Sequence, residues 1–199
     1  MLVTFLIGVP CSGKSTYRNQ MFGKKTFIIS RDDLRDKIVS EMRQAEFDVS
    51  YEDFFAKPEE GEEFSSRLYE VVNGEWSLVA EMNKRLKIRF QDQIELAKEL
   101  AKFGYEIVID LLNHTLAERK VFIQTFQELD SSVEFNAVVF DFEQNREKIK
   151  VLNERRAQQG KAIPYFVIEK FMRDLEVPSF PSEPFSKITH VDGLQGVNL

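Results

Sequence analysis

The chain has 199 residues, of which 43% are hydrophobic and 18 are Phe, enough to build one domain around a sizeable core. Its formal net charge of −6 argues against a protein that coats long duplexes, because such proteins usually present a strongly basic face. The sequence contains no run of about 18 apolar residues, so we expect no membrane span. The single cysteine excludes an internal disulfide and suits a reducing, cytoplasmic location.

Short apolar strands alternate with helical patterns along the chain. Strands are expected at residues 2–7, 26–30, 106–110 and 135–140, and helices at 31–45, 77–103, 116–128, 144–159 and 165–174. This alternation predicts an α/β fold with a doubly wound parallel sheet of four to five strands flanked by helices. Ligands of such a sheet bind at the carboxyl ends of its strands, where Ser30, Asp110 and Asp141 fall.

A phosphate-binding motif follows the first strand. Residues 8–16 read GVPCSGKST, which matches the P-loop pattern G-x-x-x-x-G-K-[ST] between a strand and a helix. The expected nucleotide-binding residues are Gly8, Pro10, Cys11, Ser12, Gly13, Lys14, Ser15 and Thr16. Lys14 is expected to reach the β- and γ-phosphates, and Ser15 to hold Mg²⁺. The motif predicts a P-loop NTPase fold that binds ATP, or another nucleoside triphosphate, with Mg²⁺. Cys11 stands where such loops more often carry Gly, and we expect its side chain to face away.

The use of the γ-phosphate depends on residues outside this loop. Many ATPases place Glu after the Asp at the strand end to activate water, whereas Asp110 is followed by Leu111 and Leu112. The sequence also lacks the N-K-x-D segment with which a GTPase reads its base. Transfer of the phosphoryl group to another acceptor is therefore favoured over hydrolysis.

A second polar cluster follows the second strand, where residues 30–35 read SRDDLR. Ser30 and Asp33 have the spacing of a capping box. Asp32 and Arg35 are three residues apart and share one face of the expected helix. Asp32 can then take a proton from an acceptor hydroxyl, and Arg35 can hold a phosphate of the acceptor. A surface salt bridge between the two is the alternative.

Two segments depart from the alternation. Residues 46–75 form an acidic insertion, and eight acidic residues stand against one Lys within residues 46–63. This charge predicts a solvated segment, either a mobile loop over the site or a decoration that adds solubility. Residues 177–199 contain three prolines and are expected to lie extended over the surface. The expected domain therefore spans residues 1–176.

Residues 144–163 form a basic segment late in the chain. Between residues 145 and 161, six basic residues accompany two acidic ones. This composition predicts a helical lid that closes over the triphosphate, where an arginine stabilises charge in the transition state. A solvated basic helix face is the alternative.

Four stretches together resemble the phage-type polynucleotide 5′-hydroxyl kinases. They are the P-loop, residues 29–35 (ISRDDLR), residues 153–156 (NERR) and residues 160–164 (GKAIP). Their order and spacing match that family over roughly residues 2–175. The resemblance implies Mg²⁺- and ATP-dependent transfer of the γ-phosphate to a 5′-hydroxyl of DNA or RNA.

The resemblance also implies roles for single residues. Asp32 matches the family's general base, Arg35 the arginine that holds the acceptor's 3′ phosphate, and Arg156 the lid arginine on the donor phosphates. Lys14 matches the P-loop lysine, so Asp32, Lys14 and Arg156 form the expected catalytic set. Asp110 matches an acidic residue near the acceptor, but apolar residues replace the polar pair expected after it.

The expected partner is therefore a 5′-hydroxyl nucleic-acid end, expected to be single-stranded, and a homo-oligomer stays open. One alternative is a kinase of the same fold that phosphorylates another hydroxyl, such as a hydroxymethyl group on a modified DNA base, a nucleoside or a small sugar. A non-catalytic ATP-binding module is the other. Residues 190–194 lack the first Asp and the Thr of the phosphatase motif D-x-D-G-T, so no phosphatase activity is expected.

Overall fold

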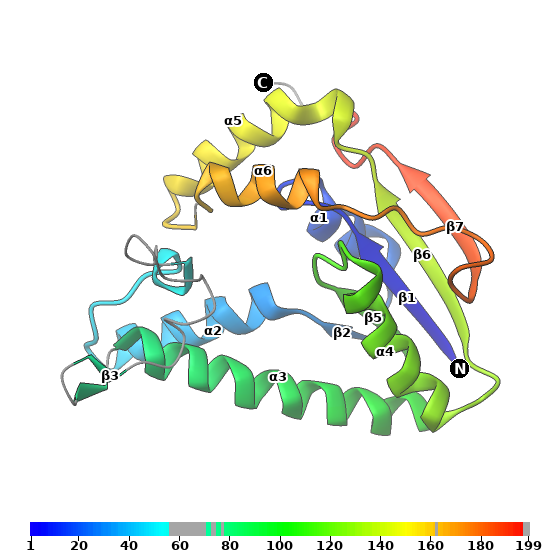
Figure 1. Ribbon diagram of the computed structural model, residues 1–199. Helices are drawn as coiled ribbons and strands as arrows, with labels where there is room; N and C mark the ends of the chain where they lie inside the picture. The colour runs from blue at the N-terminus through cyan, green and yellow to red at the C-terminus, as the bar shows by residue number, and fades with distance from the viewer. Residues whose placement is uncertain (56–70, 73–74, 77, 162, 197–199) are drawn as a thin grey trace.

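The computed structural model describes residues 1–55, 71–72, 75–76, 78–161 and 163–196 (Figure 1). Its main sheet has five parallel strands in the order β2-β5-β1-β6-β7. The strands are β1 (Leu2–Ile7), β2 (Thr26–Ile29), β5 (Glu106–Asp110), β6 (Glu134–Phe140) and β7 (Phe185–Val191). A separate antiparallel pair consists of β3 (Val71–Val72) and β4 (Glu75–Trp76). The parallel sheet confirms the predicted α/β class.

Helices follow the strands in the expected alternation. The α-helices are α1 (Lys14–Met21), α2 (Arg31–Gln44), α3 (Leu78–Lys102), α4 (Leu116–Leu129), α5 (Arg146–Ala157) and α6 (Tyr165–Arg173). Two short 3₁₀ turns are η1 (Glu52–Phe55) and η3 (Glu143–Asn145). In Figure 1, α5 and α6 lie across from α2 and α3, at the end of the sheet where the P-loop leaves β1.

The two faces of the sheet bury different helices because successive strand residues point to opposite sides. Phe5 and its neighbours on one face pack with Phe122 and Phe126 of α4 and with small residues of α3. Leu6 and Val108, on the other face, pack with Tyr17 of α1. Helices therefore cover both faces, as in a doubly wound fold, and all strand carboxyl ends point toward the P-loop.

The C-terminal segment differs from its prediction. Instead of only wrapping the surface, residues 185–191 add β7 as a parallel edge strand beside β6 (Figure 1). Sequence pattern gives little sign of this strand, because an edge strand leaves much of its length in contact with solvent. Arg119 of α4 holds the preceding residues through a buried ion pair with both carboxylate oxygens of Glu183, at 2.7 and 2.8 Å. The expected domain boundary at residue 176 thus cuts through one continuous sheet.

The acidic insertion also differs from its prediction where the structure describes it. Residues 56–70 lie outside the described residues, but Val49, Tyr51 and Phe54 are buried in the core beside α2. Three apolar side chains among acidic neighbours are enough to anchor this part, since each buries its side chain while the carboxylates remain near solvent. Residues 49–54 are therefore a packed segment rather than a solvated loop.

Candidate functional site

The P-loop has the backbone that a phosphate-binding loop requires. Gly13 precedes α1 with φ 94°, a left-handed conformation that glycine adopts without strain, and Cys11 has φ 62°. These turns place backbone amides and the N-terminus of α1 around the mouth of the loop. The hydroxyl of Ser12 is buried and makes no hydrogen bond within the described part of the chain. The hydroxyl of Ser15 lies in an exposed residue at the start of α1.

Lys14 folds back over this loop. Its Nζ donates to the carbonyls of Gly8 at 2.6 Å and Val9 at 2.9 Å. Burial lowers the pKa of the Lys14 ammonium, against the opposing charges of Asp110 and Asp32. The Lys14 ammonium is thus bound to the backbone of the loop, close enough to the carboxylates of Asp110 and Asp32 for their charges to raise its pKa.

Residues 192–194, directly after β7, pack against the P-loop. Gly193 lies so close to it that a Cβ there would come within 2.3 Å of the Ser12 carbonyl oxygen and 2.7 Å of the Phe140 ring. Asp192 holds the segment, because its Oδ1 accepts hydrogen bonds from Asn145 at 2.9 Å and from the Leu194 amide at 3.0 Å. The conformation of the P-loop therefore depends on residues some 180 positions away in the sequence.

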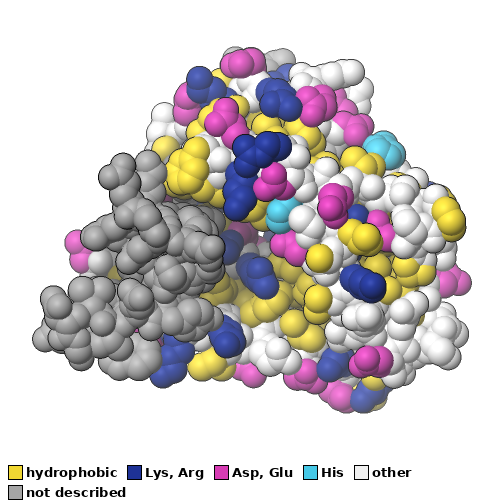
Figure 2. Space-filling view, viewed as in Figure 1, with side chains coloured by type: hydrophobic (Ala, Val, Ile, Leu, Met, Phe, Trp, Pro, Cys, Tyr) yellow, Lys and Arg dark blue, Asp and Glu magenta, His cyan; other side chains and the backbone are white. Residues whose placement is uncertain are grey.

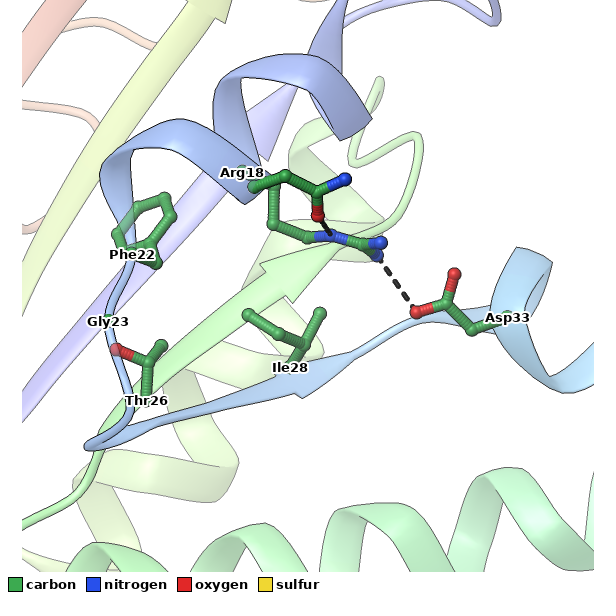
Figure 3. A pocket seen from close by; sticks show the side chains of 7 residues that line it. Arg18, Phe22, Gly23, Thr26, Ile28 and Asp33 are labelled. Carbon is green, nitrogen blue, oxygen red and sulfur yellow. Dashed lines mark hydrogen bonds and ion pairs between the residues drawn. The ribbon is translucent and has the colours of Figure 1, made fainter.

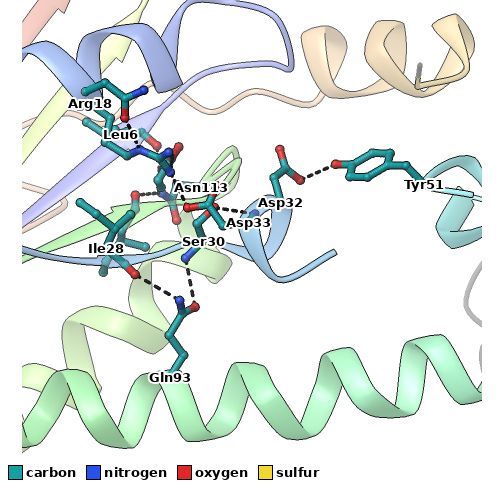
Figure 4. Close-up of polar contacts among 12 residues, drawn as sticks. Leu6, Arg18, Ile28, Ser30, Asp32, Asp33, Tyr51, Gln93 and Asn113 are labelled. Atoms are coloured by element: carbon teal, nitrogen blue, oxygen red, sulfur yellow. Dashed lines mark hydrogen bonds and ion pairs between the residues drawn. The ribbon is translucent and has the colours of Figure 1, made fainter. Parts of the chain in front are cut away.

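The start of α2 is capped almost as predicted. The Ser30 hydroxyl accepts from the Asp33 amide at 3.2 Å, but the reciprocal bond of a capping box is not made. Instead, the Ser30 amide donates to Gln93 of α3 at 3.1 Å, and Gln93 also donates to the Ile28 carbonyl (Figure 4). This leaves the Asp33 carboxylate available for Arg18.

Asp32 and Arg35 lie on one face of α2, as their spacing predicted. Arg35 Nη1 contacts Asp32 Oδ1 at 2.7 Å. The Tyr51 hydroxyl donates to the same oxygen at 2.8 Å (Figure 4). The Asp32 side chain is nevertheless 54% exposed. Burial acts to raise the pKa of this carboxyl, but Arg35, Tyr51, Lys14 and Arg156 together lower it. Asp32 is therefore an ionised, accessible carboxylate that faces the P-loop lysine.

Asp110 lies at the end of β5 and forms an ion pair with Arg18, which was not predicted from the sequence. Arg18 of α1 contacts Asp110 and Asp33 at 2.9 Å each, and the Asp110 side chain is almost fully buried. Burial raises the pKa of Asp110, although Lys14 and Arg18 favour its ionised form. Because Arg18 is four residues after Lys14 on the same helix face, the helical spacing was a signal that could have identified it.

The predicted lid is the helix α5 and the turn that follows. Arg156 Nη1 donates to the Cys11 sulfur at 3.6 Å, so the thiol faces this arginine instead of pointing away from the site. Lys161 contacts Asp36 of α2 at 2.6 Å. Asn153 closes the turn, because its side chain exchanges hydrogen bonds with both backbone groups of Ile163. The lid therefore bridges the P-loop and α2.

Other basic residues of this segment contact neighbouring residues outside the P-loop. Arg146 pairs with Glu143, and Lys148 donates to the Leu194 carbonyl at 3.3 Å. The Lys150 ammonium lies 5.9 Å from the centre of the Tyr165 ring. Among the basic residues of this segment that the structure describes, Arg156 is the one that contacts the P-loop. This contact favours a single lid arginine over a uniformly solvated basic face.

Two surface pockets flank the site. The first, about 450 Å³, is bounded by α2, Tyr51 and residues 159–161 of the lid. A volume of this size suits part of a nucleotide or a similar small ligand. On the face shown in Figure 2, Lys and Arg side chains border a hollow near the centre of the molecule.

The second pocket, about 430 Å³, lies between α1 and β2, and the ion pair of Arg18 and Asp33 lies across it (Figure 3). None of its lining residues was expected to bind a ligand.

Possible metal ligands are few. In the described ranges, no three His, Cys, Asp or Glu side chains gather closely enough to hold a metal ion by themselves. Mg²⁺ needs no such cluster when it binds together with nucleotide phosphates, because one or two protein oxygens then suffice. Ser15 and Asp110 supply oxygen donors of this kind.

None of the described helices combines the length and apolar character needed to cross a membrane.

The comparisons with known proteins place this geometry in a family. No curated protein matches the sequence significantly. Among solved structures, Kti12 from Chaetomium thermophilum in complex with ADP-AlF3 is similar, with 15% sequence identity, a TM-score of 0.46, and coverage of 97% of this chain and 94% of that one. The family model AAA_33, described as an AAA domain, matches residues 3–178. The chain thus belongs to the AAA_33 family of AAA domains, and its five-stranded sheet and P-loop are those of a P-loop NTPase.

Proposed function

We propose that this protein is an ATP-dependent kinase that transfers the γ-phosphate to a 5′-hydroxyl end of DNA or RNA. The observation that carries the proposal is the position of Asp32. Its accessible carboxylate lies close enough to Lys14 and Arg156 for their charges to affect its pKa. A carboxylate facing the cations of a P-loop is where a general base for an acceptor hydroxyl is needed.

On the donor side, the P-loop amides would surround the phosphates of ATP. Lys14 would leave the carbonyls of Gly8 and Val9 and bind the β- and γ-phosphates, which offer it a stronger, charged partner. Arg156, which contacts Cys11 of the P-loop, would also bind the phosphates. Two cations would then neutralise the charge that spreads over the transferring phosphoryl group.

The metal would be held by Ser15, through its hydroxyl, and by Asp110. When bound, Mg²⁺ would supply positive charge that offsets the negative charge of the ATP phosphates. The proximity of Asp110 to the P-loop lysine supports this assignment, since the charge of Lys14 lowers the pKa of Asp110 against the effect of burial. Asp110 would thus serve the donor half, whereas the sequence had assigned it to the acceptor.

On the acceptor side, Asp32 would accept the proton of the 5′-hydroxyl as its oxygen bonds to the γ-phosphorus. The bond from that phosphorus to the β,γ-bridging oxygen breaks, and ADP leaves. Arg35 would turn from Asp32 to a phosphate of the acceptor, because exposed ion pairs of this kind are worth only about 1 kcal/mol or less. The pocket beside Tyr51 and the lid offers room for the rest of the acceptor.

The proposal is tested with ATP labelled on the γ-phosphate and single-stranded DNA and RNA oligonucleotides that carry a 5′-hydroxyl. The matched control is the same oligonucleotide with a 5′-phosphate. Label is expected on the 5′-hydroxyl form alone. Failure to label either nucleic acid, by protein that binds ATP, would eliminate the polynucleotide acceptor.

A kinase with a smaller hydroxyl acceptor is the second candidate. The specific observation in its favour is that Asp110 is closed by Arg18 and followed by Leu111 and Leu112, which leaves fewer polar groups for a long acceptor. The test measures ATP consumption with an oligonucleotide, a hydroxymethylated base, a nucleoside or a small sugar as the acceptor, alone and in competition. If this candidate is right, a small hydroxyl compound supports ATP consumption and competes with the oligonucleotide. ATP consumption with the oligonucleotide alone would favour the polynucleotide kinase.

A further inference from the structure

Tyr51 occupies an unusual position for a residue of an acidic segment. Its side chain is only 2% exposed, and its ring packs edge-on against Phe54 with a centroid distance of 6.3 Å. The turn that carries it is fixed at both ends. The Ser50 amide donates to Asp53 at 2.6 Å, and Arg43 of α2 donates to the Val49 carbonyl at 2.7 Å. The position of the Tyr51 ring is therefore fixed by its packing and by the hydrogen bonds of the turn that carries it.

The hydroxyl of this phenol meets one particular oxygen of Asp32. Both Tyr51 and Arg35 donate to Oδ1, at 2.8 and 2.7 Å. Among the residues that the structure describes, none donates a hydrogen bond to Oδ2. Two donors on one oxygen fix the rotation of the carboxylate, and the second oxygen remains available to accept a proton.

The same turn supports Arg35. The Arg35 guanidinium lies 5.8 Å from the centre of the Phe54 ring, within the range of a cation–π contact. When Arg35 turns to an acceptor phosphate, Tyr51 is the donor that stays on Asp32. Its hydroxyl then preserves the orientation of the carboxylate during the reaction.

We propose that Tyr51 is a positioning residue that fixes the Asp32 carboxylate and aims its second oxygen at the acceptor hydroxyl. This inference rests on the proposed kinase function, but the contact itself does not depend on the identity of the acceptor. Burial and the Asp32 charge raise the pKa of Tyr51, so the phenol stays protonated and remains a donor over the working pH range. The other charged groups facing Asp32 are Arg35 on α2, Lys14 on α1, Arg156 on α5 and Asp110 on β5.

The test is Tyr51→Phe, which removes the hydroxyl and keeps the buried ring. The matched control is Tyr105→Phe, since Tyr105 precedes β5 at the opposite end of the sheet. Two quantities are measured: the titration of the Asp32 carboxyl by ¹³C NMR, assigned with Asp32→Asn, and the pH profile of kcat. In Tyr51→Phe we expect the Asp32 pKa to rise, the acid limb of kcat to move to higher pH, and kcat at neutral pH to fall roughly tenfold. The KM for ATP should not change, and Tyr105→Phe should match the wild type.

An Asp32 titration that is identical in Tyr51→Phe and wild type would overturn the inference, whatever the activity. An unchanged acid limb and unchanged kcat in an active enzyme would overturn it as well. If wild-type protein transfers phosphate to no acceptor while the Asp32 pKa still rises in Tyr51→Phe, the kinase proposal fails and the positioning contact is supported. The NMR titration thus separates the two failures.

Discussion

Replacing Gly193 by Ala should disturb the P-loop, because Gly193 packs directly against Ser12. The new Cβ would stand 2.3 Å from the Ser12 carbonyl oxygen and 2.7 Å from the Phe140 ring. Ordinary contact begins near 3.4 Å, so the loop or the C-terminal segment must move by about 1 Å. Asn145 and Asp192 hold the C-terminal segment, and the buried residue Leu194 anchors it further, so we expect the loop to give way.

The size of the effect follows from that displacement. Overpacking of this kind costs about 1–3 kcal/mol of stability, and each kcal/mol lowers Tm by about 2–4 °C in a protein of this size. A shift of about 1 Å in a group that positions the reacting atoms costs on the order of 10²-fold in rate. Gly193→Ala is therefore expected to fold, to melt a few degrees lower, and to lose most of its phosphoryl transfer.

Calorimetry gives the Tm and the ATP affinity, and labelled ATP gives the rate. Gly23→Ala is the matched control, because a Cβ there meets nothing within 4 Å. Wild-type ATP affinity, rate and Tm in Gly193→Ala would contradict the close packing between the C-terminal segment and the P-loop.

Three further predictions concern ion pairs and pH. Arg119→Met should cost about 3–5 kcal/mol in urea denaturation, because it leaves Glu183 buried without its partner; a loss below 1 kcal/mol would refute this. Lys161→Ala should cost about 1 kcal/mol or less at low salt and nothing at high salt, since its partner Asp36 is half-exposed, and a salt-independent loss would speak against a simple ion pair. The pKa of Asp32 is lower in the folded chain, so its ionised form stabilises the fold above the unfolded pKa of about 3.9, and this contribution is lost as pH falls through the folded pKa. Asp32→Asn should therefore show a weaker pH dependence of stability in that acid range, and parallel curves for variant and wild type would contradict it.

The geometry that sequence predicted around the candidate site is local. The P-loop pattern identifies Gly13 and Lys14 because loop geometry and the helix start are encoded in a few adjacent residues. Asp32 and Arg35 fall together because three residues separate them on one helix, a spacing that fixes their common face. Ser30 was recognised as a cap for the same reason.

The parts that sequence missed depend on contacts between distant segments. Tyr51 meets Asp32 across 19 positions, from a segment whose charge suggested a solvated loop. Gly193 packs on the P-loop from the other end of the chain. Strand β7 lies at the edge of the sheet, so few of its residues are buried and its sequence shows no clear apolar pattern. The proline-rich sequence before it also suggested an extended tail. Arg18 is the exception, since its spacing from Lys14 was available but its partner Asp110 was known only as a strand end.

The central claim is that a P-loop donor half and an Asp32 acceptor half act together in phosphoryl transfer. The most direct measurement compares wild type and Asp32→Asn for ATP affinity and for transfer of labelled γ-phosphate to a 5′-hydroxyl oligonucleotide. We expect similar ATP affinity and a transfer rate lowered by about 10²–10⁴-fold in Asp32→Asn, because the variant side chain cannot accept the proton. Equal transfer rates would contradict the role of Asp32, and label released only as inorganic phosphate by the wild type would contradict the kinase itself.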